Sequence, residues 1–223
     1  MRGRVLRLLP VLAAVSVALG CADARDHRQS VCALIDVSGT YADQRAEVAS
    51  VIKRQVLPEL LPGDTLLVIR IDSQSYEKDN VEALVTLDER PSRANAQKLA
   101  VAKRLDAFAA SAPTSEYTDI PGAMMLGAEY LREIGAGSRV MLVFSDLHED
   151  LPAGTRRQLE ERELDGVSVV AMNVKRLHAD GADPAVFRGR LSDWERRVTS
   201  AGATDWQTLA DAGRLAGVLA AVR

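Results

Sequence analysis

The sequence predicts a doubly wound α/β domain, with a mostly parallel sheet, one antiparallel edge strand and helices on both faces. Short apolar runs alternate with amphipathic stretches along the chain. Most of these runs are apolar at successive positions, which is typical of strands covered by helices on both faces of a sheet. The 223 residues suffice for one such domain and not for two. A composition of 47% hydrophobic and 26% charged residues excludes a disordered or collagen-like chain.

The predicted strands fall into two kinds. Runs that are apolar at nearly every position predict buried strands at Val31–Ile35, Leu66–Ile71, Val140–Phe144 and Val167–Met172. The segment 81–87 alternates instead, with Val81, Ala83, Val85 and Leu87 on one face. Alternation of this kind suits a strand at the edge of the sheet.

Helical spacing of apolar residues marks the segments between the strands. The predicted apolar faces are Val48, Val51, Ile52 and Val56, then Ile120, Met124, Ala128 and Leu131, and finally Phe187, Leu191, Trp194 and Val198. We expect Trp194 to lie in the core. The tail 204–223 should add a short segment and a last helix, and no second domain is expected.

The first residues are typical of a secretory signal. Arg2, Arg4 and Arg7 precede the apolar run 11–20, which is too short to span a bilayer as a helix. Ala18-Leu19-Gly20-Cys21 resembles the bacterial lipobox, in which the cysteine is lipidated and becomes the mature N-terminus. The alternative is cleavage after Ala24, at an A-x-A site that releases a soluble protein.

The chain is therefore expected to comprise a signal peptide at 1–20, a lipidated N-terminus and linker at 21–30, and one domain at 31–223. Lipidation of Cys21 would anchor it to a membrane on the extracytoplasmic side of the bacterial cell envelope. Cleavage after Ala24 would leave it secreted or periplasmic. If Cys21 carries lipid, Cys32 is left unpaired, and we expect it to be a small buried hydrophobe.

The charge balance argues against nucleic acid as a partner. The chain has 28 basic and 31 acidic residues, a net charge of -3. Removing residues 1–20, which hold three arginines and no acid, leaves 25 basic and 31 acidic residues, a net charge of -6. A strongly basic surface is the usual mark of nucleic-acid binding, and this chain lacks the composition for it.

Oxygen-bearing side chains gather where the predicted strands end. Asp36, Ser38 and Thr40 follow the first strand, Asp146 follows the strand at 140–144, and Thr118 stands before a helix. In a doubly wound sheet, ligands bind beyond the carboxyl ends of the strands. Two carboxylates and three hydroxyls suit Mg²⁺, Mn²⁺ or Ca²⁺, and disfavour zinc or copper. These five residues are the predicted metal ligands.

This set resembles the metal-ion-dependent adhesion site of von Willebrand factor type A domains, over residues 30–201. The resemblance implies that Ser38 and Thr40 bind the cation directly, Thr118 directly or through water, and Asp36 and Asp146 mostly through water. It also implies a non-enzymatic domain, in which an acidic residue of a protein partner completes the metal's coordination shell.

The sequence departs from that family's pattern at two positions. The family usually has Ser where Thr40 stands, a change that keeps the hydroxyl. It usually has Gly after the last Asp, where this chain has Leu147. The acidic residues Asp119, Glu149 and Asp150 are either groups that support the ligands or solvated loop acids.

Two other functions remain open. The segment from Asp36 to Thr40 also resembles the first motif of haloacid-dehalogenase phosphatases, with Ser145 and Lys175 in place of later motifs. That chemistry needs a second aspartate as general acid, and Ser38 occupies its position. The other alternative is a structural envelope lipoprotein with no functional metal site.

Overall fold

The computed structural model describes residues 26–39, 41–111, 114–172, 174 and 184–223. The predicted signal peptide, the predicted lipidation site Cys21 and the predicted metal ligand Thr40 lie outside the described residues.

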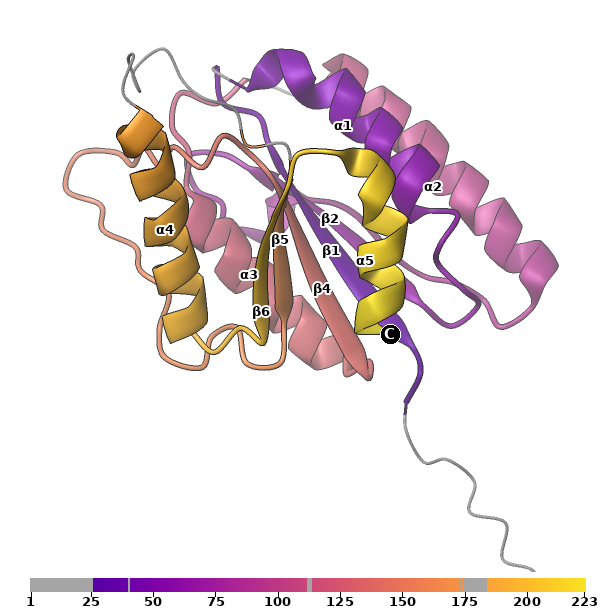
Figure 1. Ribbon diagram of the computed structural model, residues 1–223. Helices are drawn as coiled ribbons and strands as arrows, with labels where there is room; N and C mark the ends of the chain where they lie inside the picture. The colour runs from indigo at the N-terminus through magenta and orange to yellow at the C-terminus, as the bar shows by residue number, and fades with distance from the viewer. Residues whose placement is uncertain (1–25, 40, 112–113, 173, 175–183) are drawn as a thin grey trace, which may run out of the picture.

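One sheet of six strands organises the domain (Figure 1). The strands are β1 (Gln29–Asp36), β2 (Thr65–Ile71), β3 (Val81–Thr86), β4 (Ser138–Phe144), β5 (Ser168–Met172) and β6 (Asp205–Leu209). Their order across the sheet is β3-β2-β1-β4-β5-β6. Every neighbouring pair is parallel except β2 and β3, which are antiparallel. The predicted fold class, including the antiparallel edge strand, is therefore confirmed.

Helices cover both faces of the sheet (Figure 1). They are α1 (Arg45–Val51), continued by the π-helical turn η2 (Ile52–Val56), α2 (Pro91–Ser111), α3 (Ile120–Ile134), α4 (Pro184–Ser200) and α5 (Leu215–Val222). Short 3-10 turns lie at η1 (Ala42–Gln44), η3 (Lys78–Asn80) and η5 (Ala212–Arg214).

Successive residues of β1 face two separate cores, because side chains alternate across a strand. Ala33 belongs to the core that α1, α2 and α5 cover. Its neighbour Cys32 belongs to the core beneath α3 and α4. Cys32 is fully buried, and Trp194 of α4 is 2% exposed in the same core, as the sequence predicts for both.

The structure adds a helix that the sequence analysis did not assign. Helix α2 buries Ala94, Val101, Leu105 and Phe108 against the sheet. These four positions have helical spacing, but the rest of the segment is rich in alanine and charge, so the apolar stripe is narrow. Strand β1 also begins at Gln29, two residues before the predicted start of the domain at 31.

The strand order places a topological switch point between β1 and β4. The chain leaves β1 towards β2 on one side, and it later returns to β4 on the other side of β1. In open α/β sheets the crevice at such a point, beyond the carboxyl ends of the strands, is where ligands bind. Asp36 and Asp146 lie at the carboxyl ends of these two strands.

Both ends of the described chain lie at the opposite edge of the sheet (Figure 1). The C-terminal Arg223 donates to the Asp64 carboxylate, with Nη2 to Oδ2 at 2.7 Å, and to the carbonyl of His27 at 3.4 Å. Asp64 also accepts from the backbone N–H of Gln29, which begins β1. This buried carboxylate therefore holds the start of the first strand to the end of the last helix.

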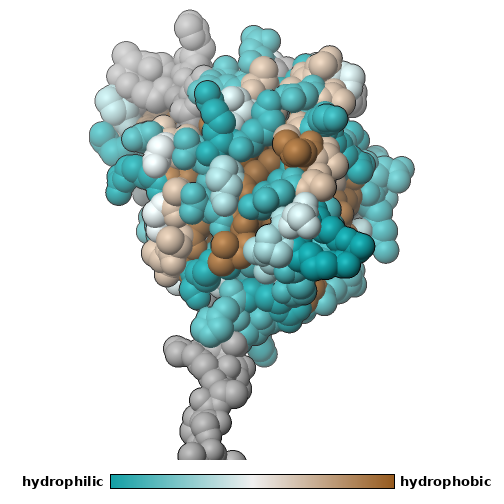
Figure 2. Space-filling view, turned by 90° about the vertical axis from the view of Figure 1, so that its right-hand side faces the viewer, coloured by the Kyte–Doolittle hydropathy of each residue, from teal (hydrophilic) through white to brown (hydrophobic). Residues whose placement is uncertain are grey.

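The outer surface is mostly polar. Figure 2 shows one face that is largely hydrophilic with a smaller hydrophobic area. Among the described residues, the exposed large apolar side chains are Leu61, Tyr76, Leu84, Leu99 and Val186. No helix in the described ranges combines the length and apolar character that crossing a bilayer requires.

Candidate metal centre

The two predicted carboxylate ligands meet at the switch point. Asp36 ends β1 and is fully buried, and Asp146 is 2% exposed two residues beyond β4. The two strands are adjacent, with Ile35 of β1 in register with Phe144 of β4. Burial raises the pKa of Asp36, and the negative charge of Asp146 adds to that rise. A cation between two carboxylates removes this repulsion, which makes the pair a candidate metal centre.

Neutral donors hold the Asp36 carboxylate in place. Its Oδ1 accepts from the backbone N–H of Ser38 at 2.8 Å, and its Oδ2 accepts from the Ser145 hydroxyl at 2.6 Å. Hydrogen bonds from Ser145 and Ser38 favour the ionised form and oppose the effect of burial on the Asp36 pKa. The carboxylate is therefore fixed in orientation by neutral donors, and among the described residues it forms no ion pair with a positive side chain.

Backbone hydrogen bonds join the loops that carry the predicted hydroxyl ligands. The N–H of Ser115 donates to the carbonyl of Val37 at 3.0 Å, next to Ser38. Thr118 and Asp150 exchange two backbone hydrogen bonds, of 2.7 and 3.2 Å. Ser38 and Thr118 are each 4% exposed. The loops after β1, before α3 and after β4 thus form one connected edge.

Asp119 is a structural support of this edge. Its Oδ1 caps α3 by accepting from the N–H of Gly122 at 2.9 Å, and its Oδ2 pairs with Arg157 Nε at 3.2 Å. A third contact comes from the N–H of Ser75 at 3.2 Å. A β-carbon on Gly122 would lie 2.2 Å from the Asp119 carboxylate, so any larger residue there would displace the cap. Since Thr118 directly precedes this cap, Asp119 fixes the backbone of Thr118.

The two other acids named in the sequence analysis have different roles. Glu149 pairs with Arg197 at 2.7 Å, so it is engaged with α4. Asp150 contributes its backbone to the bridge with Thr118, while the residue itself is exposed.

Leu147 adopts the backbone conformation that glycine favours. Its φ is 61°, in the left-handed region that costs a non-glycine residue about 1 to 2 kcal/mol. The residue is held there by burial, at 1% exposure, and by the Trp194 indole, which donates to its carbonyl at 2.8 Å. The sequence departs from the adhesion-site pattern at this position, yet the backbone keeps the geometry that a glycine would provide.

Two residues near the site were not predicted as part of it. The sequence assigns Ser145 only to the phosphatase alternative, although its place directly after β4 is a usable signal. Tyr41 is 2% exposed, and its hydroxyl has no hydrogen-bond partner among the described residues. Burial raises the pKa of Tyr41, and the charges of Asp36 and Asp146 add to that rise. Tyr41 therefore lies within the electrostatic reach of both carboxylates.

The donor set fits a hard divalent cation. Asp36, Asp146, Ser38 and Thr118 offer only oxygen, which Mg²⁺, Mn²⁺ and Ca²⁺ prefer. In the ranges that the structure describes, no three His, Cys, Asp or Glu side chains form a group that could hold a metal. A cation at this edge would consequently depend on the two hydroxyls as well as on the two carboxylates.

Comparisons with known proteins give a likeness of fold. No protein-family model and no curated protein matches the sequence. Among solved structures, a mutant of the PilB minor pilin from Streptococcus sanguinis has a TM-score of 0.51 at 9% identity, over 87% of this chain and 60% of the pilin. At such low identity, this match shows a shared fold alone.

Two further solved structures are similar with lower scores. Proximal thread matrix protein 1 from the mussel byssus has a TM-score of 0.48 at 13% identity, over 89% of this chain and 48% of that protein. A von Willebrand factor type A protein from Catenulispora acidiphila has a TM-score of 0.46 at 12% identity, over 86% of this chain and 41% of that protein. The chain thus spans about half the length of the first of these and less of the second.

Proposed function

We propose that this chain is a von Willebrand factor type A-like domain of the bacterial cell envelope, which binds a protein partner through a divalent cation. The observation that carries the proposal is the buried pair Asp36 and Asp146 at the switch point, with Ser38 and Thr118 on loops tied to the same edge. These four residues would hold the cation, together with Thr40, which the sequence predicts as a ligand.

When bound, the cation supplies a positive centre with an open coordination position, to which a carboxylate of the partner can bind. The chain's own residues keep that centre in place. Ser145 orients Asp36 through the 2.6 Å hydrogen bond, and Asp119 fixes the segment of Thr118 through the cap of α3. Rigid ligands of this kind lower the entropy that binding costs.

The same contacts support a binding role over a phosphatase. The phosphatase alternative uses Asp36 as a nucleophile and needs an acid two residues later, where Ser38 stands. The two oxygens of Asp36 accept from the Ser38 N–H and the Ser145 hydroxyl. We infer that Asp36 serves as a fixed charge opposite a cation.

Attachment at Cys21 would direct the site away from the membrane. The described chain begins at Asp26, at the amino edge of the sheet (Figure 1). The site lies at the carboxyl edge, and the eight residues of β1 separate the two edges by roughly 25 Å. A lipid on Cys21 would leave this carboxyl edge open to a partner in the envelope.

Partner capture with and without EDTA tests the proposal. The full chain, wild type or carrying Asp36→Asn or Asp146→Ala, is used as bait in an envelope extract containing Mg²⁺. We expect EDTA and each substitution to release the same partner, because each removes the cation or a charge that faces it. The exposed Arg104→Gln on α2 is the control and should keep the partner. A partner that stays bound in EDTA and to both site variants would contradict the proposal.

A further inference from the structure

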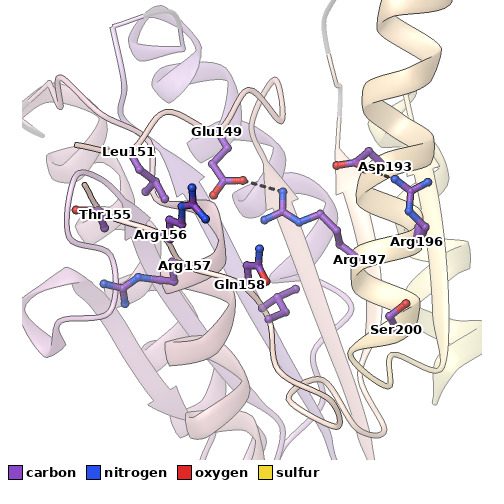
Figure 3. A pocket seen from close by; sticks show the side chains of 11 residues that line it. Glu149, Leu151, Thr155, Arg156, Arg157, Gln158, Asp193, Arg196, Arg197 and Ser200 are labelled. Atoms are coloured by element: carbon purple, nitrogen blue, oxygen red, sulfur yellow. Dashed lines mark hydrogen bonds and ion pairs between the residues drawn. The ribbon is translucent and has the colours of Figure 1, made fainter. Parts of the chain in front are cut away.

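An arginine-rich hollow lies next to the candidate metal centre. It has a volume of about 700 Å³ and separates the loop after β4 from α4 (Figure 3). Among its lining residues, the charged ones are Arg156, Arg157, Arg196, Arg197, Glu149 and Asp193. Four arginines against two carboxylates make the hollow locally positive, although the chain as a whole carries a net charge of -3.

The four arginines differ in whether an acidic side chain of the protein already pairs with them. Arg157 pairs with the buried Asp119, and Arg196 pairs with Asp193 on its own helix. Arg197 stacks on the Trp194 ring at 4.0 Å and pairs with Glu149. Arg156 is exposed, and no ion pair within the described ranges includes it. Its charge is therefore available to a ligand.

The Glu149 carboxylate indicates which chemistry the hollow binds. In Figure 3, the side chains of Arg156 and Arg197 point towards this carboxylate from opposite sides. Arg197 Nη1 lies 2.7 Å from Glu149 Oε2. A guanidinium group fixed by an aromatic face is suited to bind a carboxylate through charge-assisted hydrogen bonds. The structure thus holds one carboxylate in the position where an external one would compete.

Two contacts link the lining of the hollow to the edge that carries the candidate metal site. Asp150, next to Glu149, pairs with the backbone of Thr118, and Arg157 bonds to Asp119 beside Thr118. A partner that brings a carboxylate to the cation would therefore place its neighbouring residues over this hollow.

We propose that the hollow binds an acidic segment of the protein partner, with one of its carboxylates between Arg156 and Arg197 in competition with Glu149. The identity of the occupant rests on the proposed function, because the same partner supplies the carboxylate for the cation. Complementary charge and the shared edge favour an acidic peptide over other anions.

Fluorescence anisotropy of the full chain with a labelled peptide of alternating glutamate and glycine tests this inference. Arg156→Gln should weaken peptide binding by up to about fivefold, the upper range for one exposed charge pair. Glu149→Gln should strengthen binding, because it removes the internal competitor for Arg197. Arg104→Gln on α2 removes the same charge elsewhere and should leave the affinity unchanged. None of these three substitutions removes a buried side chain.

The opposite signs of the two effects make the test specific. Equal affinities for wild type, Arg156→Gln and Glu149→Gln would overturn the inference, as would an equal loss in Arg104→Gln. Tighter binding of a single-stranded DNA than of the peptide would assign the hollow to nucleic acid and overturn it too. The measurements are repeated in EDTA, where the Arg156→Gln effect should persist. Asp36→Asn tests the proposed function separately. This variant should lose the part of peptide binding that depends on Mg²⁺ and keep the part that persists in EDTA.

Discussion

Ser145→Ala should destabilise the domain more than an ordinary buried serine substitution does. The Ser145 hydroxyl donates to the Asp36 carboxylate at 2.6 Å and accepts from the N–H of Leu147 at 3.0 Å. A hydrogen bond to a charged group contributes about 1.5 to 3 kcal/mol, and a buried N–H left without a partner costs about 1 kcal/mol or more. We therefore expect a loss of about 3 kcal/mol in the free energy of unfolding. For a chain of this size that lowers Tm by about 6 to 12 °C.

Urea unfolding followed by circular dichroism, in EDTA so that cation binding does not enter, measures this loss. Ser168→Ala is the matched control, because Ser168 lies in β5 at 2% exposure and its hydroxyl has no hydrogen-bond partner among the described residues. Removing that hydroxyl should leave stability unchanged or raise it slightly. A Ser145→Ala variant within 0.5 kcal/mol of Ser168→Ala, where ~0.5 kcal/mol is the usual spread of neutral substitutions, would refute the reasoning.

Three further predictions concern the cation, the buried thiol and the anchor. Magnesium at 100 times its Kd should raise the Tm of the wild type by roughly 5 to 10 °C, because binding at that concentration stabilises the folded state by about 2.7 kcal/mol. Asp36→Asn should remove this rise. Calorimetric scans of the wild type that show no shift in Tm would count against the site. Burial raises the pKa of the Cys32 thiol and shields it from reagents. In a Cys21→Ser chain, where Cys32 is the one cysteine left, a disulfide reagent should therefore react only after the protein is unfolded. Labelling of the native protein would contradict the packing. The wild type should fractionate with membranes and Cys21→Ser should not, because several acyl chains anchor firmly; a mature N-terminus at Arg25 by intact mass would refute lipidation.

The sequence alone predicted five of the six strands and the two carboxylates of the candidate site. Apolar runs predicted β1, β2, β4 and β5, because strands buried on both faces are apolar at most positions. Once two runs are parallel neighbours, the residues that end them share an edge. The positions of Asp36 and Asp146 thus followed from local pattern and topology.

Only the tertiary structure decided which groups support those carboxylates. Ser145 forms a hydrogen bond to Asp36, although 109 positions of sequence separate them. Asp119, which supports the same edge, contacts Ser75 and Arg157 on two separate loops. The hollow likewise depends on tertiary structure, because the loop with Arg156 lines one side of it and the helix with Arg197 lines the other. Helix α2 was missed for a different reason, since its buried residues have helical spacing but form only a narrow apolar stripe in a segment rich in alanine and charge.

The physical difference is one of range. The spacing of apolar residues in a strand or helix indicates which side chains are buried, and this spacing can be read within a short segment of the sequence. A hydrogen bond or ion pair between distant loops depends on where packing places both partners, so neither sequence segment carries it alone. Leu147 shows both the local and the long-range kind of determination. Its side chain is buried as its apolar character predicts, while its left-handed backbone is held by burial and by Trp194, 47 positions away.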